Sequence, residues 1–273
     1  MRQGKRAALE WPGSRADASR RLSGMTSMAP PVERRRPTPT PGAPETSAVR
    51  SMFDRIAPRY DLLNHVLSGG IDALWRRRAV AALGARPGAR VLDLCTGTAD
   101  LLVAWLRRDA AGRGLGLDLS AAMLGRGAAK LSRAGMRARA GLAAGDAQEL
   151  PLRGGSFDGV LVGFGIRNVG DPRRALAEVL RVLRPGGRLV VLEFSMPPGI
   201  RGRLYRAYSR HLLPRIGAWI SGDGGAYDYL PASIARFATP AEFRASMEAA
   251  GFVAVRARAL TGGIVTLYEG ERP

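Results

Sequence analysis

From about residue 90 to the C-terminus, short apolar runs rich in β-branched residues alternate with longer stretches of helical periodicity. Because βαβ units pack their helices against a shared sheet, this alternation favours an α/β fold with a parallel sheet. The predicted strands cover residues 90–94, 114–119, 141–145, 157–164 and 188–194. The predicted crossover helices carry apolar residues at i, i+3 and i+4 and cover residues 99–108, 121–133 and 172–183.

The C-terminal segment continues the pattern with one helix and two strands. Thr239 followed by Pro240 is typical of an N-cap with proline at the first helical position, and Gly251 is expected to end that helix. Two closing antiparallel strands at 252–260 and 264–269 are predicted to pair through the Thr-Gly-Gly turn between them. We therefore expect a seven-stranded, mostly parallel sheet whose last strand is antiparallel.

The N-terminal segment has a different composition. Residues 1–46 are rich in Arg, Pro, Ser and Thr and show no sustained apolar period, so they cannot bury enough surface to offset the entropy of ordering. The first basic residues are not followed by the apolar stretch that a secretory signal peptide requires. We predict a disordered, basic, Pro-rich tail over residues 1–46 and one globular domain over residues 47–273.

The formal net charge of +19 comes from 42 basic residues, of which only Lys5 and Lys130 are lysine. A bias toward arginine, alanine, glycine and proline is the ordinary result of a GC-rich genome, and attraction to nucleic acid or anionic lipid is the functional alternative. Aromatic residues make up only 6% of the chain and the arginines are scattered, so we expect no nucleic-acid partner.

The single cysteine, Cys95, excludes an internal disulfide and favours a reducing compartment. We also predict no metal site. The apolar runs stop well short of the roughly 20 residues that a membrane-spanning helix needs. A cytoplasmic protein is therefore expected, and peripheral contact with the inner face of the membrane stays open.

The first predicted strand ends at Leu94, and the chain then turns into a helix through Cys-Thr-Gly-Thr-Ala-Asp. Gly97 lets the backbone approach a ligand closely, and the helix N-terminus offers unsatisfied N–H groups to an anionic end. A dinucleotide fingerprint needs three glycines in this loop, and only one is present. The loop therefore favours S-adenosylmethionine, which carries a carboxylate and no phosphate.

Two acidic residues follow predicted strands at the same edge of the sheet. Asp118 lies 21 positions after Gly97, where a carboxylate can accept hydrogen bonds from both ribose hydroxyls. Its alternative role is to cap the next helix, although Ser120 can serve as that cap. The Asp146 side chain and the backbone amide of Ala147 are predicted to border the adenine, and an ordinary Asx turn is the structural alternative.

Three segments resemble the ubiquinone/menaquinone biosynthesis C-methyltransferase family. Residues 60–68, continuing to Trp75, are similar to its Y-D-x-M-N-x-x-L-S-x-x-x-H-x-x-W signature, and residues 181–195 are similar to its R-V-L-K-P-G-G-x-L-x-x-L-E-x-S block. Phe-Gly-Ile-Arg-Asn-Val at 164–169 is a third family feature, and the resemblance spans about residues 52–269. It implies a class I S-adenosylmethionine-dependent methyltransferase with a Rossmann-like sheet.

Several positions depart from the family pattern. Leu63 stands where methionine is usual, and Asp72 replaces the signature histidine, so no role is carried over to that imidazole. Thr96 and Ala99 replace glycines of the common G-G-T-G-D loop, and Gly163 stands where some relatives have a serine that contacts the cofactor. The match implies that the cofactor is held by Gly97, Thr98, Asp118, Asp146 and Ala147.

The resemblance also implies that Arg167 and Asn168 are catalytic. Methylation at carbon requires an electron-rich ring, and a hydroquinone becomes one when a hydroxyl loses its proton. Arginine is a poor proton acceptor, so we interpret Arg167 as stabilising the phenolate and orienting a water that removes the proton. Asn168 would position the hydroxyl. The structural alternative for Arg167 is an ordinary ion pair with a carboxylate.

The acceptor is expected to be a polyprenyl quinol, either demethylmenaquinol, a naphthoquinol, or the benzoquinol precursor of ubiquinol. The alternatives are another small-molecule acceptor and a non-enzymatic nucleic-acid-binding module. Tyr60 and Asp61 are predicted to belong to an N-terminal helical lid over the cofactor. Residues 203–221 form a predicted amphipathic helix that either covers the core or lines a polyprenyl entrance at a lipid surface. Neither His65 nor His211 is assigned a catalytic role, and a homodimer stays open.

Overall fold

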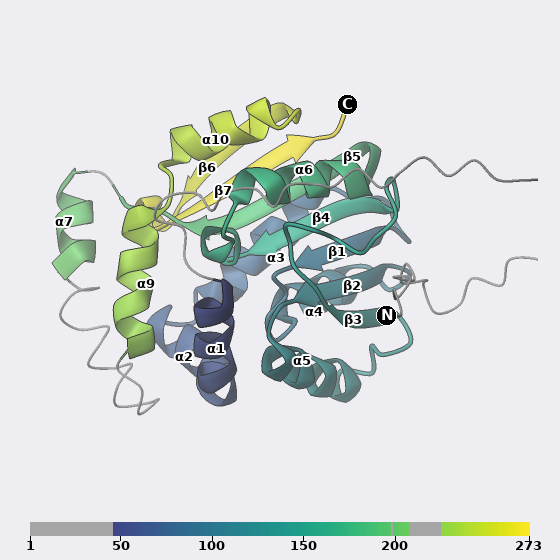
Figure 1. Ribbon diagram of the computed structural model, residues 1–273, viewed down its shortest axis with the longest axis horizontal. Coiled ribbons are helices and arrows are strands. Elements are labelled where there is room, and N and C mark those ends of the chain that lie inside the picture. Colours follow the sequence, from purple (N-terminus) through teal and green to yellow (C-terminus); the bar gives the residue numbers. More distant parts are fainter. Residues whose placement is uncertain (1–45, 198, 208–224) are drawn as a thin grey trace, which may run out of the picture.

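The computed structural model describes residues 46–197, 199–207 and 225–273. Its centre is a seven-stranded sheet in the order β3-β2-β1-β4-β5-β7-β6 (Figure 1), which confirms the predicted fold class. The predicted disordered tail lies outside the described residues, apart from Thr46 at the start of the first helix. The strands are β1 (Arg90–Leu94), β2 (Arg113–Asp118), β3 (Ala140–Ala144), β4 (Phe157–Gly163), β5 (Leu183–Phe194), β6 (Val253–Leu260) and β7 (Val265–Glu271).

Among the described strands, only β7 runs against the rest of the sheet. It pairs antiparallel with β5 on one side and with β6 on the other, so β6 runs in the same direction as β5. The predicted pairing of the two closing strands and the predicted antiparallel last strand are therefore confirmed. A helical crossover precedes β6. The short turn η4 (Thr261–Gly263) then reverses the chain, and β7 lies between β5 and β6.

Strand β5 starts five residues earlier than the predicted 188–194. Leu183 pairs with Phe157, and the register shifts before Gly159 pairs with Arg188. The intervening Gly186 has a φ of +72°, which a residue without a Cβ adopts at little cost. The irregular pairing over the Pro-Gly-Gly segment therefore precedes the regular part of the strand, which begins at the predicted Arg188.

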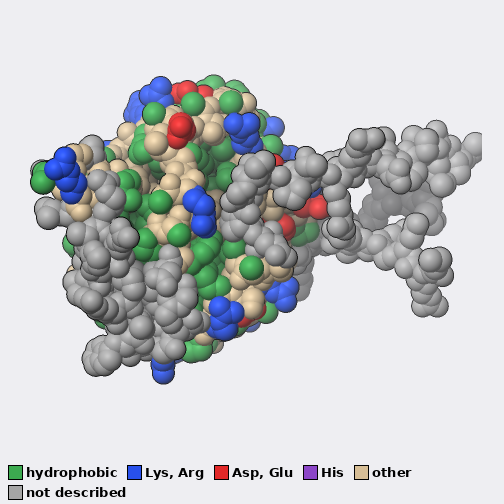
Figure 2. Space-filling model, turned by 60° about the vertical axis from the view of Figure 1, so that its left-hand side comes forward, with side chains coloured by type: hydrophobic (Ala, Val, Ile, Leu, Met, Phe, Trp, Pro, Cys, Tyr) green, Lys and Arg blue, Asp and Glu red, His purple; other side chains and the backbone are tan. Residues whose placement is uncertain are grey.

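Several helices gather at the carboxyl ends of the parallel strands (Figure 1). Ligands bind at this edge in open α/β sheets, so these helices frame the candidate site. Where side chains are described on the face in Figure 2, basic groups lie apart with hydrophobic surface between them. The helices at the carboxyl ends of the parallel strands are α1 (Thr46–Ile56), η1 (Ala57–Arg59), α2 (Tyr60–Leu67), α7 (Gly199–Ala207), α9 (Gly225–Arg236) and η2 (Ile166–Asn168).

The predicted helix over 203–221 is described only as far as Ala207, and His211 lies outside the described residues. None of the helices in the described ranges is both long and apolar enough to cross a bilayer.

Helices cover both faces of the sheet. The N-cap predicted at Thr239 is confirmed, because its side chain and that of Glu242 form a reciprocal capping box. One face is covered by α6 (Pro172–Val182) and α10 (Pro240–Ala249). The other is covered by α3 (Asp72–Leu83), α4 (Asp100–Arg108) and α5 (Ala121–Arg133). The bounds of α4, α5, α6 and α10 agree with the prediction to within about two residues, whereas no bounds were predicted for α3.

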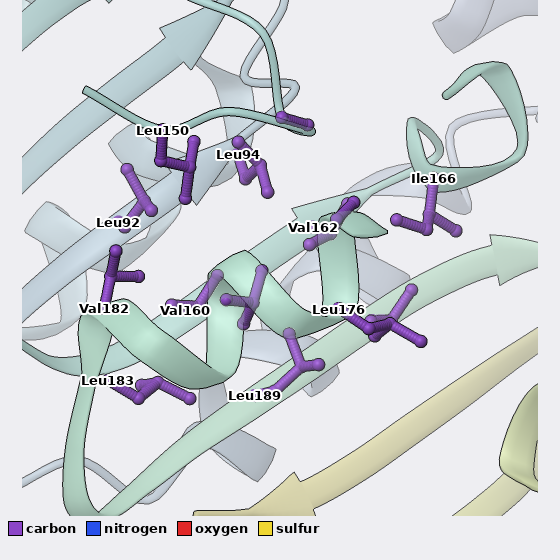
Figure 3. Packing of buried hydrophobic residues seen from close by; sticks show 14 of the residues in the cluster. Leu92, Leu94, Leu150, Val160, Val162, Ile166, Leu176, Val182, Leu183 and Leu189 are labelled. Atoms are coloured by element: carbon purple, nitrogen blue, oxygen red, sulfur yellow. The ribbon is translucent and has the colours of Figure 1, made fainter. Parts of the chain in front are cut away.

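Neighbouring strand residues pack into opposite layers of the core. Leu92 and Val160 lie in the layer beneath α6 (Figure 3), whereas Val91 and Leu161 lie in the layer beneath α3 and α4. All four side chains are completely buried. Burial on both faces requires nearly continuous apolar strands, which is why the central strands lack an alternating polar pattern.

Candidate active site

The loop after β1 is shaped by the buried carboxylate of Asp93. Its Oδ2 accepts hydrogen bonds from Thr96 Oγ1 at 2.5 Å and from the Leu102 N–H at 3.1 Å, so it joins the loop to the first turn of α4. Burial raises the pKa of Asp93 to about 7, against the effect of these two donors. Ala99 has a φ of +66°, which costs a non-glycine residue on the order of 1 kcal/mol.

Asp118 joins the end of β2 to the same loop. Its Oδ2 accepts the Gly97 N–H at 2.8 Å, and its Oδ1 accepts the Ser120 N–H at 2.9 Å. Burial raises the pKa of Asp118 despite these donors. Ser120 caps α5 by accepting the Met123 N–H at 3.1 Å, so the cap does not depend on Asp118.

A narrow pocket of about 70 Å³ lies at the carboxyl ends of β1, β2 and β3. Phe53 of α1 and Tyr60 of α2 contribute to its wall. Asp146 also forms the Asx turn considered above, because its Oδ1 accepts the Gln148 N–H at 2.9 Å. Four of the five predicted cofactor-binding residues line this pocket: Gly97, Asp118, Asp146 and Ala147.

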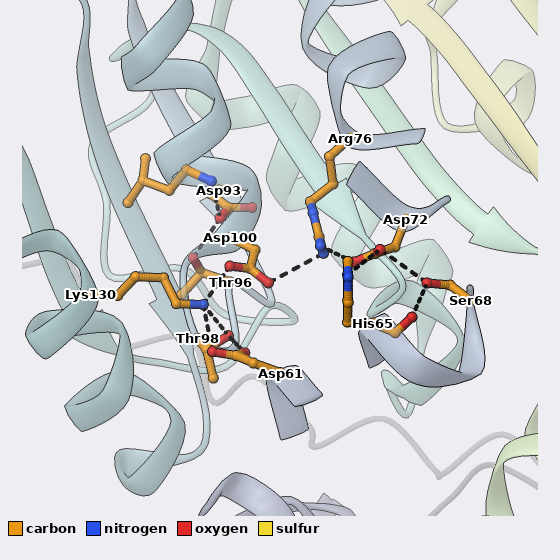
Figure 4. Close-up of polar contacts among 11 residues, drawn as sticks. Asp61, His65, Ser68, Asp72, Arg76, Asp93, Thr96, Thr98, Asp100 and Lys130 are labelled. Atoms are coloured by element: carbon orange, nitrogen blue, oxygen red, sulfur yellow. Dashed lines mark hydrogen bonds and ion pairs between the residues drawn. The ribbon is translucent and has the colours of Figure 1, made fainter. Parts of the chain in front are cut away.

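The fifth, Thr98, does not line the narrow pocket. Its side chain is buried, and its hydroxyl donates to Asp61 Oδ1 at 2.5 Å and accepts from Lys130 Nζ at 3.1 Å (Figure 4). Lys130 also pairs with Asp61 Oδ2 at 2.8 Å and with Asp100. These contacts tie α2 to the loop after β1 and to α5.

Arg76 extends this network to α3 (Figure 4). It lies 3.3 Å from Asp100 Oδ2 and also pairs with Asp72, which stands where the family has histidine. Asp72 is buried and accepts a hydrogen bond from Ser68 Oγ at 3.0 Å. His65 lies 3.4 Å from Asp72, but its side chain is 66% exposed and lines neither the narrow pocket nor the wide one described next.

A wide pocket of about 620 Å³ adjoins the narrow one. Phe53, Tyr60 and Phe164 line both pockets, so the two share a wall. The rings of Phe164 and Phe194 lie with their centroids 4.5 Å apart, and Trp75 packs edge-on against Phe194 at 6.4 Å. The lining is mainly apolar and aromatic, which suits a flat hydrophobic ligand.

Arg167 and Asn168, the predicted catalytic residues, lie in η2 between the two pockets. Arg167 lines the wide pocket, and Asn168 lines the narrow one. The ion pair considered as an alternative for Arg167 is present, because Nη1 lies 2.8 Å from Glu193 Oε1. A Cβ on Gly165 would lie 2.3 Å from Cys95 Cβ, so only glycine lets η2 approach the loop after β1 this closely.

The site residues that were not among those predicted include Asp93, Lys130 and Glu193. Asp93 and Glu193 each place one acid within a run of apolar strand residues, and both are almost completely buried. A lone acid flanked by buried apolar residues is the sequence signal that could have identified them. Lys130 carries a weaker signal, because it is one of only two lysines in the chain.

Comparison with known proteins decides the family. The model of the ubiE/COQ5 methyltransferase family matches residues 42–272. The chain belongs to this family. It is 50% identical over 225 residues to the ubiquinone/menaquinone biosynthesis C-methyltransferase UbiE of Syntrophotalea carbinolica, covering 82% of this chain and 93% of that protein. It is 46% identical to the demethylmenaquinone methyltransferase of Thermus thermophilus, covering 81% of this chain and all of that protein.

Solved structures confirm the fold of this ubiE/COQ5 family member. The [4+2]-cyclase SpnF has a TM-score of 0.65 at 19% identity and covers 85% of this chain and 98% of that one. An S-adenosylmethionine-dependent methyltransferase of Thermotoga maritima, described as a possible histamine N-methyltransferase, has a TM-score of 0.57 at 22% identity, covering 82% of this chain and all of that one. At such identities the likeness concerns the fold alone. Family membership confirms the prediction of a methyltransferase.

Proposed function

We propose that this methyltransferase transfers the methyl group of S-adenosylmethionine to a ring carbon of a polyprenyl quinol, either demethylmenaquinol or the benzoquinol precursor of ubiquinol. The observation that carries the proposal is the shared wall between the two pockets, with Asn168 on the narrow side and Arg167 on the wide side. The names of the relatives support the quinone class of acceptor.

The narrow pocket has the donors and acceptors that a nucleoside needs. Asp118 would accept hydrogen bonds from the ribose hydroxyls, the left-handed turn at Gly97 would receive the amino-acid end, and Asp146 and Ala147 would border the adenine. Thr98 acts indirectly, by holding the loop against Asp61 and Lys130. The pocket volume of about 70 Å³ is well below the roughly 300 Å³ of a small ligand pocket, so we expect α1 and α2, which supply Phe53 and Tyr60, to shift on binding.

When bound, S-adenosylmethionine supplies an electrophilic methyl group. The Arg167 guanidinium would lower the pKa of a ring hydroxyl in the wide pocket and stabilise the phenolate. Its Nε and Nη1 are held by Ser233, Phe164 and Glu193, whereas Nη2 has no hydrogen-bond partner within the described ranges. Nη2 is therefore the donor available to the acceptor, and water takes the proton.

The proposal is tested by incubating the protein with labelled S-adenosylmethionine and each demethylated quinol, followed by mass analysis. We expect a single added methyl group on the ring. Arg167→Ala should still bind S-adenosylmethionine in calorimetry but should lose turnover. Unchanged turnover would remove Arg167 from the mechanism, and a folded wild-type sample that binds no S-adenosylmethionine would overturn the assignment of the narrow pocket.

We also propose that the polyprenyl chain of the acceptor enters from a lipid surface beside α2 and α3. Four of the six large hydrophobic side chains exposed in the described part of the chain lie there, namely Leu62, Val66, Ile71 and Leu74. Ile71 also lines the wide pocket, so the apolar surface continues into it. Such a patch is typical of an interaction surface.

A vesicle-flotation assay tests this entrance. The double change Leu62→Gln and Val66→Gln should reduce the fraction of protein that floats with anionic vesicles. Val253→Gln is the control, because Val253 is 46% exposed at the start of β6, at the amino ends of the parallel strands. Equal flotation of both variants would argue against the α2–α3 surface.

A further inference from the structure

Helix α9 contacts both of the proposed catalytic residues. The Tyr229 hydroxyl donates a hydrogen bond to Asn168 Oδ1 at 3.0 Å, and Ser233 Oγ accepts one from Arg167 Nε at 3.3 Å. Residues four positions apart lie on the same face of a helix. One face of α9 therefore contacts both Arg167 and Asn168. Ser233 is 3% exposed, and its own proton is directed to the Leu230 carbonyl at 2.9 Å.

We propose that Tyr229 is a positioning residue that fixes the orientation of the Asn168 amide, and thereby turns the Nδ2 hydrogens toward the acceptor oxygen. The inference rests on the proposed function and deepens it. A side-chain amide can rotate by 180° with little change in shape, and the rotation exchanges a donor for an acceptor. A donor stabilises a developing phenolate, whereas a carbonyl oxygen repels it.

The environment of Tyr229 keeps its hydroxyl a donor. Burial raises the pKa of Tyr229, and the nearby cations of Arg167 and Arg236 lower it by less, so the phenol stays protonated at neutral pH. The guanidinium of Arg236 lies 5.8 Å from the centre of the tyrosine ring and helps to hold it. A neutral phenol has one proton to donate, and Asn168 Oδ1 receives it.

The hydrogen bond also crosses the boundary between the two pockets. Tyr229 lines the wide pocket, whereas Asn168 lines the narrow one. An amide fixed at this boundary lies beside the place where the acceptor ring and the methyl group must meet. Its orientation should therefore affect turnover more than the binding of either ligand alone.

The composition of the chain allows a direct test by NMR. Asn64 and Asn168 are the only two asparagines among the 273 residues, so ¹⁵N-asparagine labelling gives two side-chain amide pairs. Asn168→Asp removes and thereby assigns one pair. Tyr229→Phe should shift the Asn168 pair and leave the Asn64 pair in place. An Asn168 pair that does not move would overturn the proposal, whether or not the wild-type protein methylates quinols.

A double-mutant cycle adds a kinetic readout, provided that wild-type turnover has first supported the proposed function. Tyr229→Phe should lower kcat about tenfold or more with little change in KM, and should shift the acidic limb of the kcat profile to higher pH. The double variant with Asn168→Ala should lose no more than Asn168→Ala alone. Losses that multiply, or an unchanged kcat, would overturn the proposal.

The control for removal of a tyrosine hydroxyl is Tyr268→Phe. Tyr268 is completely buried in β7 and lines neither the narrow nor the wide pocket, so this variant should keep its kcat. A loss in Tyr268→Phe equal to that in Tyr229→Phe would show a general effect on the fold and would overturn the positioning role.

Discussion

Arg167 Nη1 lies 2.8 Å from Glu193 Oε1, and the two side chains are only 6% and 0% exposed. Glu193 also accepts the backbone N–H of Arg167 at 3.3 Å and that of Phe194 at 2.9 Å. The carboxylate therefore holds both the side chain and the backbone of Arg167 against the end of β5. A buried charge fixed in this way has its counter-charge in place before any acceptor binds.

Replacing Glu193 by glutamine should destabilise the fold, because it leaves the Arg167 cation buried without a partner. We expect the free energy of unfolding to fall by about 3–5 kcal/mol, measured by chemical denaturation. The double variant Arg167→Met with Glu193→Gln should recover most of that loss and still lack turnover. Wild-type turnover in the double variant would show that the pair is structural only.

Replacing Asp118 by asparagine should weaken cofactor binding. The carboxylate loses charge-assisted hydrogen bonds worth about 1.5–3 kcal/mol, which corresponds to roughly a 10- to 150-fold rise in the Kd for S-adenosylmethionine by calorimetry. Asp158→Asn is the matched control, because Asp158 lies at the opposite end of the sheet and pairs with Arg184 at 2.7 Å. The assignment fails if both variants bind S-adenosylmethionine equally well.

The buried carboxyl of Asp93 should make stability depend on pH. Its pKa is raised to about 7 in the folded protein, chiefly by burial, from roughly 4 when unfolded. Between these values the folded state holds a proton that the unfolded state has released. The stability from this group is therefore fully present below about pH 4 and is lost as the pH rises through about 7.

Asp93→Asn removes this titration. The free energy of unfolding of the variant, measured by urea denaturation at a series of pH values, should change less between about pH 4 and 7 than that of the wild type. Parallel curves for the two proteins would contradict the raised pKa of Asp93.

Weakening the contact between α2 and the loop after β1 should speed the release of S-adenosylmethionine. Asp61 is 45% exposed, so its pair with Lys130 at 2.8 Å is worth at most about 1 kcal/mol. Its loss should therefore raise the Kd for S-adenosylmethionine by at most roughly fivefold. Asp61→Asn should accelerate hydrogen exchange over residues 52–75 in the free protein, and Lys130→Met should act in the same direction. In the wild type, hydrogen exchange over residues 52–75 should slow when S-adenosylmethionine is added. Unchanged hydrogen exchange would show that this segment is not a lid over the cofactor.

Most strands and crossover helices could be predicted because their periodicities are local. The contacts that shape the site could not, since they join distant parts of the chain: Thr98 meets Asp61 across 37 positions, and Arg167 meets Ser233 across 66. Thr98 was predicted to touch the cofactor from the family resemblance, which gives its place in the loop but not the direction of its hydroxyl. The direction of β6 likewise depends on how the chain crosses the sheet, which local patterns do not encode.

The turn η2 is three residues long, and its consecutive polar residues Arg167 and Asn168 line different pockets. The order of these two residues decides which pocket receives the guanidinium and which receives the amide. Ligand binding and methyl transfer can therefore fail separately in this protein. A substitution of either residue is expected to change the polar lining of one pocket and to leave that of the other in place.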